Sequence, residues 1–226
     1  MKRMLILSSV VLVIGAAAIL PAQAPVPVGK EPRHKTLLDT FVFRILEVTV
    51  PPGDTTLDHS HDRDIATVSL NESSRRGRVP GEDWSAPRER PRGSVEVTEY
   101  TGKPGTHRVE TVSKTPYHLI AVENHKTGSW TTPKPLKAPG TTLNRETRAF
   151  SVYDVKLGPS TPQTAHVHDV TAVAVLVSGT IENGGSNGEE PAKFERAGQW
   201  IFIPTGPHEM NVFGPGEAHV VEIEVR

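Results

Sequence analysis

The sequence of 226 residues contains no cysteine. This absence excludes a zinc ribbon, a thiol nucleophile and a framework of disulfide bonds. An excess of charge of one sign is also lacking, because the formal net charge is −1, and nothing in the composition indicates binding to nucleic acid. Helical periodicity is lacking as well. The 20 prolines, 19 glycines and many segments rich in Val and Thr predict short strands joined by turns, and therefore an all-β protein.

One long apolar run occurs, at the N-terminus. Residues 4–20 are almost wholly apolar, follow a basic start and precede an Ala-Gln-Ala sequence that resembles a cleavage site. Residues 1–24 are therefore predicted to be an export signal. Pro25 disfavours cleavage directly before it, which leaves a retained membrane anchor as the alternative. In both cases we expect the folded part to be periplasmic or extracellular, with membrane contact only if the segment is retained.

A His-x-His triplet occurs twice, and the sequence around it is repeated. At an offset of 107 residues, 43–48 lies on 150–155 and the first triplet lies on the second. At an offset of 101 residues, three further pairs coincide: His107 with His208, His118 with His219, and Glu123 with Glu224. The two offsets differ by six residues, which indicates one unit used twice, with a longer internal loop in the first copy.

Each triplet has the spacing of a pair of metal ligands. Residues i and i+2 of a strand point to the same face, so the two histidines of a triplet bring their imidazoles into one space. A third histidine occupies an equivalent place in each copy. The sequence therefore predicts two metal sites, formed by His59, His61 and His107 in the first copy and by His166, His168 and His208 in the second.

The repeat predicts two domains of roughly 90 residues each, at 36–125 and 147–226. Residues 25–35 carry Pro and charge without periodicity and are predicted to be a solvated lead-in. Residues 126–146, rich in Lys, Thr, Pro and Gly, are predicted to be an exposed linker. Residues 71–92 predict a long polar loop whose arginines are balanced by acidic residues; the alternative is that these arginines attract an anionic substrate.

The two motifs resemble those of the cupin family, in which His-x-His is followed by Gly-x5-Pro-x-Gly-x-His. In the second copy the matching residues are Gly198, Pro204, Gly206, His208 and Asn211, with a spacing one residue short after Gly206 and after His208. In the first copy they are Gly53, Gly105 and His107, and the proline is absent. The resemblance covers nearly all of 36–226. It implies a bicupin, with two antiparallel β-barrels of the jelly-roll type that each hold a metal in the barrel mouth.

The sequence departs from the family at one ligand. Most metal-binding cupins carry a glutamate a few residues after His-x-His, and here the nearest positions hold Asp64 or Ile65 in the first copy and Ala172 or Val173 in the second. The second site is therefore predicted to have three histidines, and the first to have three histidines with or without Asp64. Neutral imidazoles suit a divalent transition metal such as Fe, Cu, Mn, Ni or Zn better than Mg or Ca.

For several other residues the sequence allows two possible roles. The paired His118 and His219 either line the pockets as acid or base groups or have a structural role inside a unit or between the units. Three aromatic residues of the second copy either wall its site or belong to a core: Tyr153, Trp200 and Phe202. His34 and His125 have no partner in the repeat, and we expect both on the surface.

Three functions remain open. The first is a metal-dependent oxidoreductase, a dioxygenase-like enzyme that binds a small chelating organic substrate and O2 at a three-His metal. The second is a non-catalytic protein that binds a metal or a small ligand. The third is a structural bicupin in which one degenerate copy serves as the face of a homodimer. The missing glutamate argues against oxalate-type chemistry, and Ala172, Ala174 and Leu176 predict the more closed, apolar pocket at the second site.

Overall fold

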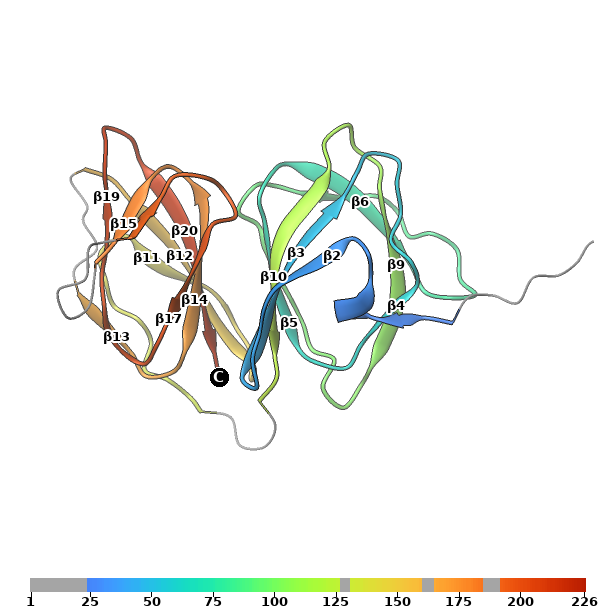
Figure 1. The fold of residues 1–226 in the computed structure, drawn as a ribbon, viewed down its shortest axis with the longest axis horizontal. Helices are drawn as coiled ribbons and strands as arrows, with labels where there is room; N and C mark the ends of the chain where they lie inside the picture. The colour runs from blue at the N-terminus through green and yellow to red at the C-terminus, as the bar shows by residue number, and fades with distance from the viewer. Residues whose placement is uncertain (1–23, 127–130, 160–164, 185–191) are drawn as a thin grey trace, which may run out of the picture.

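The computed structural model describes residues 24–126, 131–159, 165–184 and 192–226. The predicted export signal or anchor lies outside the described residues except for Ala24. Strands dominate the described part, whose one helical element is a 3-10 helix, η1 (Val28–Lys30). No helix in these residues is long and apolar enough to cross a membrane. The predicted all-β class is confirmed, and Figure 1 shows two barrels side by side.

The first domain consists of two five-stranded sheets, in the orders β2-β3-β10-β5-β8 and β1-β4-β9-β6-β7. Side chains alternate along each strand, so that Leu119 and Ala121 of β10 point into the core between the sheets. The strands are β1 (Val26–Pro27), β2 (His34–Asp39), β3 (Phe43–Val50), β4 (His59–His61), β5 (Ile65–Ser69), β6 (Ser73–Arg78), β7 (Arg88–Arg90), β8 (Val95–Thr98), β9 (Gly105–Thr111) and β10 (Tyr117–Asn124).

The second domain has one five-stranded sheet, in the order β11-β12-β20-β14-β17, and two smaller sheets, β13-β18 and β16-β15-β19. Its inward side chains, among them Ala174 and Met210, form a second apolar core. The strands are β11 (Thr141–Glu146), β12 (Phe150–Leu157), β13 (His166–His168), β14 (Ala172–Ser178), β15 (Ile181–Asn183), β16 (Ala192–Phe194), β17 (Trp200–Ile203), β18 (Gly206–His208), β19 (Met210–Val212) and β20 (Ala218–Val225).

Strand pairing repeats between the domains. β4 pairs antiparallel with β9, which places His59 opposite His107, and β13 pairs antiparallel with β18, which places His166 opposite His208. The pairing brings the third histidine of each copy beside the first. The duplication inferred from the sequence is therefore also a duplication of strand register.

The extra residues of the first copy fall in two places, where the sequence predicted one longer loop. β5 pairs with β8 and β14 pairs with β17 in equivalent registers, at an offset of 107 residues for the first strand of each pair and 105 for the second. Two of the six extra residues therefore precede β8, and four lie between β8 and β9. The loop from β8 to β9 comprises residues 99–104, whereas the loop from β17 to β18 comprises only 204–205.

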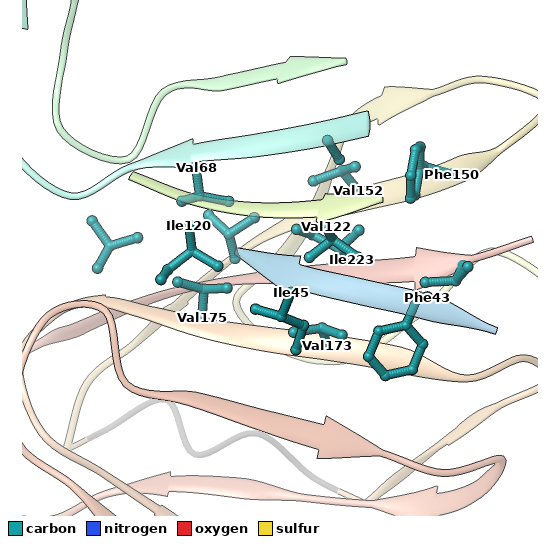
Figure 2. Packing of buried hydrophobic residues seen from close by; sticks show 14 of the residues in the cluster. Phe43, Ile45, Val68, Ile120, Val122, Phe150, Val152, Val173, Val175 and Ile223 are labelled. Carbon is teal, nitrogen blue, oxygen red and sulfur yellow. The ribbon is translucent and has the colours of Figure 1, made fainter. Parts of the chain in front are cut away.

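The two domains pack against each other through the sheet that contains β10 in the first domain and the five-stranded sheet of the second. On β10, Ile120 and Val122 point away from the first barrel, and on β14, Val173 and Val175 point away from the second; these side chains meet in one interdomain core (Figure 2). β14 is apolar on both faces because one face lines the second barrel and the other lies in the interdomain core. These two sheet faces are therefore buried within the chain.

Two aromatic residues considered as walls of the second site lie in this contact instead. β17 pairs with β14 so that Ile201 and Ile203 face the second barrel, while Trp200 packs against the interdomain core. The ring of Phe202 stacks on Phe43 of the first domain, with 5.8 Å between the centroids. Neither residue walls the second site. Both take the alternative place in a core, because even-numbered positions of β17 face the other domain.

Three segments predicted to be exposed contain strands. In the lead-in, β1 pairs in parallel with β4, and Val28 and Glu31 are buried. In the predicted loop 71–92, β6 pairs with both β7 and β9. In the predicted linker, β11 pairs with β12. Polar composition concealed these strands, because a strand with one solvated face needs few apolar residues.

Candidate metal centres

The first centre is formed where β4 meets β9. His59 and His61 point inward from β4, and His107 joins them from β9. Their ring centroids are 4.5 to 5.1 Å apart, and one ring nitrogen of each lies within 4.8 Å of one nitrogen of the others. The structure thus brings the three histidines predicted for the first copy to one point.

The ring nitrogens of this centre are available to a metal ion. Nδ1 of His59 donates to the carbonyl oxygen of Leu57 at 2.9 Å, which leaves Nε2 with a free lone pair. Neither ring nitrogen of His61 has a hydrogen-bond partner among the described residues, although the side chain is buried. Buried imidazole nitrogens without partners are costly unless they bind something. The donor set fits a divalent transition metal.

Burial makes these imidazoles neutral at pH 7. Burial, together with the charges of neighbouring histidines, lowers the pKa of His59 to about 4, that of His107 to about 3 and that of His61 to about 2. A neutral imidazole is the form that binds a metal. Protons therefore compete with a metal at this centre only in acid.

The metal-free protein is expected to lose stability as the pH falls below about 6.5. Unfolding restores the pKa of each histidine to about 6.5. Between that value and the lower folded-state pKa, the unfolded state binds more protons, so each histidine lowers the free energy of unfolding by at most ~1.4 kcal/mol per pH unit. Urea denaturation of chelator-treated protein from pH 7.5 to 5 measures the slope. His61→Gln should make the dependence of the free energy of unfolding on pH shallower. A slope in this variant equal to that of the wild type would contradict the expectation.

A cavity of about 660 Å³ opens onto the first centre. Apolar side chains, including Val48, Ile65 and Leu119, form one part of its wall, and Arg75 and Arg78 contribute to a polar part. The size and the mixed wall suit a small organic ligand. The more enclosed pocket had been predicted at the second site, but there the inward residues of β14 pack against other apolar side chains of the barrel core.

Arg75 and Arg78 lie on the cavity wall, whereas the sequence predicted them in a solvated loop. The side chain of Arg75 is 16% exposed, and its Nη2 donates to Glu96 at 3.0 Å. The guanidinium of Arg78 lies over the ring of Trp84, 5.0 Å from its centroid. The Nε atoms of Arg75 and Arg78 are buried and lack a partner among the described residues. Both arginines therefore bring positive charge to the wall of the cavity.

Asp64 does not complete the first centre as a fourth ligand. Its Oδ1 accepts hydrogen bonds from the backbone amides of Tyr100 and Thr101, each at 2.7 Å, and Oδ2 lies 3.5 Å from Arg148. The carboxylate is fully buried and is not in the group of close donor atoms formed by the three histidines. Of the two ligand sets that the sequence left open, the structure therefore favours three histidines without Asp64: Asp64 follows β4 by three residues, and its side chain fixes the loop before β9.

His34 was expected on the surface and lies on the cavity wall instead. Its side chain is 7% exposed, and its ring centroid is 4.8 Å from that of His59. Nδ1 of His34 lies 2.5 Å from Oε2 of the buried Glu31. The expectation also fails for His125, whose side chain is 16% exposed and whose Nδ1 donates to Thr40. Neither residue has a counterpart in the repeat, so sequence comparison within the chain gave no signal.

The second centre has four donor groups where three were predicted. His166, His168 and His208 meet as expected, and Glu222 of β20 joins them, with the donor atoms within 4.8 Å of one another. The carboxylate oxygens of Glu222 lie 3.9 Å from Nε2 of His166 and 3.7 Å from Nε2 of His208. Neither oxygen has a hydrogen-bond partner among the described residues. A buried carboxylate aimed at three imidazoles fits a metal ion.

A further carboxylate supports the second centre from behind. Nδ1 of His168 donates to Oε1 of Glu224 at 3.1 Å, and both side chains are fully buried. This contact fixes the tautomer of His168 and directs its Nε2 towards His166, 3.1 Å away. Burial raises the pKa of Glu222, but the surrounding histidines outweigh burial and lower it overall, so this carboxylate is ionised.

Glu222 could not be predicted from the internal repeat because the two copies differ at this position. At the offset of 101 residues its counterpart is Ala121, which lies on the wall of the first cavity. The one available signal was two glutamates alternating with apolar residues along β20, a strand that is otherwise buried. Glu123, the counterpart of Glu224, pairs with Arg44 at 2.9 Å and lies 3.8 Å from His125, so it does not support a histidine of the first centre.

His118 and His219 lie outside both centres. They sit on the faces of β10 and β20 that point away from the barrels and towards the interdomain contact, where His118 lies 3.1 Å from Glu47 and His219 lies 2.8 Å from Asp154. The structural alternative fits these ion-pair contacts.

Tyr153 is the third aromatic residue that was considered as a wall of the second site. It is buried and accepts a hydrogen bond from the amide of Leu136 at 3.3 Å. Burial raises its pKa, and the charge of Glu224 adds to the effect.

Comparisons with known proteins identify the fold. No family model matches the sequence, and no curated protein is significantly similar to it. The oxalate decarboxylase of Lactobacillus farciminis, in a formate complex, matches with a TM-score of 0.61 and 12% identity, over 83% of this chain and 78% of its own. AerE from Microcystis aeruginosa matches with a TM-score of 0.61 and 12% identity, over 89% of this chain and 98% of its own.

A variant of the oxalate decarboxylase of Bacillus subtilis also matches, with a TM-score of 0.58 and 10% identity, over 81% of this chain and 69% of its own. Similarity at this level of identity shows the fold. The cupin fold implied by the sequence motifs is confirmed, and this chain carries groups in both barrels that could hold a metal.

Proposed function

We propose that this protein is an exported, metal-dependent enzyme whose first centre acts on a small, anionic, chelating organic compound. The observation that carries the proposal is the meeting of three buried, neutral imidazoles, from His59, His61 and His107, at the wall of the cavity of about 660 Å³. The second centre, which has a carboxylate of its own, is proposed to keep its metal permanently. The proposal of export rests on residues 1–24.

The charges around the two centres support an anionic ligand. At the second centre, Glu222 and Glu224 place two carboxylates beside the histidines, so the protein itself neutralises a divalent ion. The first centre has three neutral imidazoles and no carboxylate in its group of donor atoms. A divalent ion there would keep its full charge unless the ligand supplied negative oxygen donors. Arg75 and Arg78 on the cavity wall favour the same ligand class.

The donor set supports a divalent transition metal, Fe, Cu, Mn, Ni or Zn, which when bound would supply Lewis-acid or redox chemistry. Mn(II) centres are known in the similar oxalate decarboxylase of B. subtilis. The three histidines hold one side of the site and leave the cavity side to the substrate. The apolar wall of Val48, Ile65 and Leu119 limits water there. With no carboxylate among the donors to act as a base, we favour an oxygen-dependent oxidation of the dioxygenase type.

A second candidate function is decarboxylation of a small dicarboxylate at the second centre. Glu222 favours it, because this residue supplies the carboxylate whose apparent absence argued against oxalate-type chemistry. Oxalate decarboxylases are also among the structures that share the fold. The candidates differ in gas exchange: metal-loaded protein would consume O2 with a diketone or a catechol in the first case and release CO2 from oxalate in the second.

Metal analysis of the untagged protein tests both candidates. We expect about two equivalents of metal per chain and a loss of one equivalent in each of His59→Ala and His166→Ala, because each variant removes one ligand from one centre. His59→Ala should also abolish O2 consumption. Turnover that survives in His59→Ala but fails in His166→Ala would transfer the activity to the second centre. Wild-type protein that binds no metal after reconstitution would exclude both enzyme functions.

A further inference from the structure

The longer loop between β8 and β9 carries an aromatic side chain into the first centre. The loop of residues 99–104 includes Tyr100, and the shorter loop 204–205 of the second domain, Pro-Thr, has no aromatic residue. The ring of Tyr100 stacks on the imidazole of His61, with 4.7 Å between the centroids and 10° between the planes. Tyr100 also lies on the wall of the cavity. The longer loop therefore adds a further difference between the two centres.

Neighbouring backbone leaves room for this ring. A Cβ atom added to Gly105 would lie 2.7 Å from Cε1 of Tyr100, which is closer than real contacts allow. The motif glycine at position 105 is thus explained by the approach of Tyr100. In the second domain, a Cβ on the counterpart Gly206 would meet no atom within 4 Å.

Tyr100 contacts His61, whereas the second centre uses a carboxylate to hold the equivalent His168. His168 is held by Glu224, whereas its counterpart His61 has no hydrogen-bond partner among the described residues. Glu123, which would occupy the equivalent place, is paired with Arg44. Stacking on Tyr100 therefore fixes the ring of His61 in place of a hydrogen bond.

The hydroxyl of Tyr100 has a donor left for a ligand. Its oxygen lies 3.5 Å from Nδ1 of His107. If Nε2 of His107 is kept for a metal, Nδ1 carries the proton and donates to the oxygen of Tyr100. The hydrogen of the hydroxyl is then left for an acceptor in the cavity.

Two charged residues fix the loop that carries Tyr100. Asp64 accepts from the amides of Tyr100 and Thr101 at 2.7 Å, although full burial of a carboxylate is costly. Arg148, just before β12 of the second domain, donates to the carbonyl oxygen of Thr101 at 2.8 Å and lies 3.6 Å from Glu99. Contacts from both domains therefore set the position of the ring.

We infer that Tyr100 is a ligand-binding residue of the first centre, whose hydroxyl donates a hydrogen bond to an anionic oxygen of the bound compound. Asp64 and Arg148 are its positioning residues, so the first centre is complete only with the second domain in place. The inference rests on the proposed function of this centre as a metal site for an anionic compound. It adds a neutral hydrogen-bond donor for the bound oxygen anion.

Oxalate binding to the cobalt-loaded full chain tests the inference. Oxalate is the probe anion, and the visible absorption of Co(II) reports binding, with His59→Ala as the variant that should lose the response. Tyr100→Phe removes only the hydroxyl and is expected to raise the dissociation constant about tenfold, because one hydrogen bond to a charged group is lost. The cobalt content should stay that of the wild type.

The positioning residues give a second readout. Asp64→Asn and Arg148→Gln should each weaken oxalate binding, and neither should add to the effect of Tyr100→Phe when combined with it. Arg145→Gln, an exposed arginine on β11, is the matched control and should bind as the wild type does. Unchanged affinity in Tyr100→Phe, or loss of its cobalt, would overturn the ligand contact and leave the proposed function intact. A wild-type protein without an oxalate response would overturn both.

Discussion

Glu222→Gln is expected to weaken metal binding at the second centre by more than about 100-fold. Residues that only support a ligand from behind typically contribute 10- to 100-fold to metal affinity, and Glu222 is itself a donor in the group. The amide keeps the shape of the side chain but removes the charge that a buried divalent ion requires. Competition with a chromogenic chelator, combined with elemental analysis, measures the change.

Two further variants give this experiment its scale. Glu224→Gln leaves the four donors in place and removes the negative charge of the group that accepts the His168 proton, so we expect a smaller loss, of about 10- to 100-fold. Glu182→Gln, in the same domain but paired with the exposed Lys193, should change nothing. If Glu222→Gln held its metal as tightly as the wild type, the second centre would be a three-His site as the sequence first indicated.

The histidines could be predicted because their geometry is local. A His-x-His triplet in a strand fixes the direction of two side chains, and the repeat located His107 and His208 without any knowledge of the fold. Glu222 could not be found in this way. Its position depends on the pairing of β20 with β12 and β14, which are distant in the sequence, and its counterpart Ala121 carries no ligand.

The same difference between local geometry and tertiary contacts explains why the roles of Asp64 and Tyr100 were not predicted. Asp64 stands near the family position of a glutamate ligand, but the loop of residues 99–104 folds over it and takes up its carboxylate through two backbone amides. Loop conformation depends on contacts with the rest of the protein, including Arg148 of the other domain. A pattern of spacings shows which residues could be ligands, and tertiary contacts decide which of them are.

The arrangement of the two domains could be predicted from the sequence only in part. Residues 170–177 are apolar at almost every position, which predicts a strand buried on both faces. The pattern cannot say what covers the second face. In the structure that cover is the first domain of the same chain, which explains why Trp200 and Phe202 lie between the domains and not beside the second centre.

Phe43→Ala is expected to lower the free energy of unfolding by about 3–5 kcal/mol, the range for large aromatic residues in cores. Phe43 is 1% exposed and belongs to the interdomain core (Figure 2), and its ring stacks on Phe202. Because the interdomain core contains residues of both barrels, we expect one cooperative transition, shifted as a whole. Urea denaturation of the full chain, followed by circular dichroism and by tryptophan fluorescence, measures it.

Phe41→Ala is the matched control, two residues away in the same hairpin. Phe41 is 93% exposed, so its removal should change the free energy of unfolding by less than about 0.5 kcal/mol. Two separate unfolding transitions, of which Phe43→Ala shifts only that of the first domain, would show that the barrels unfold independently. A single shifted transition would make the interdomain core a shared source of stability, and it would explain how Arg148 can hold the loop of Tyr100 from the other domain.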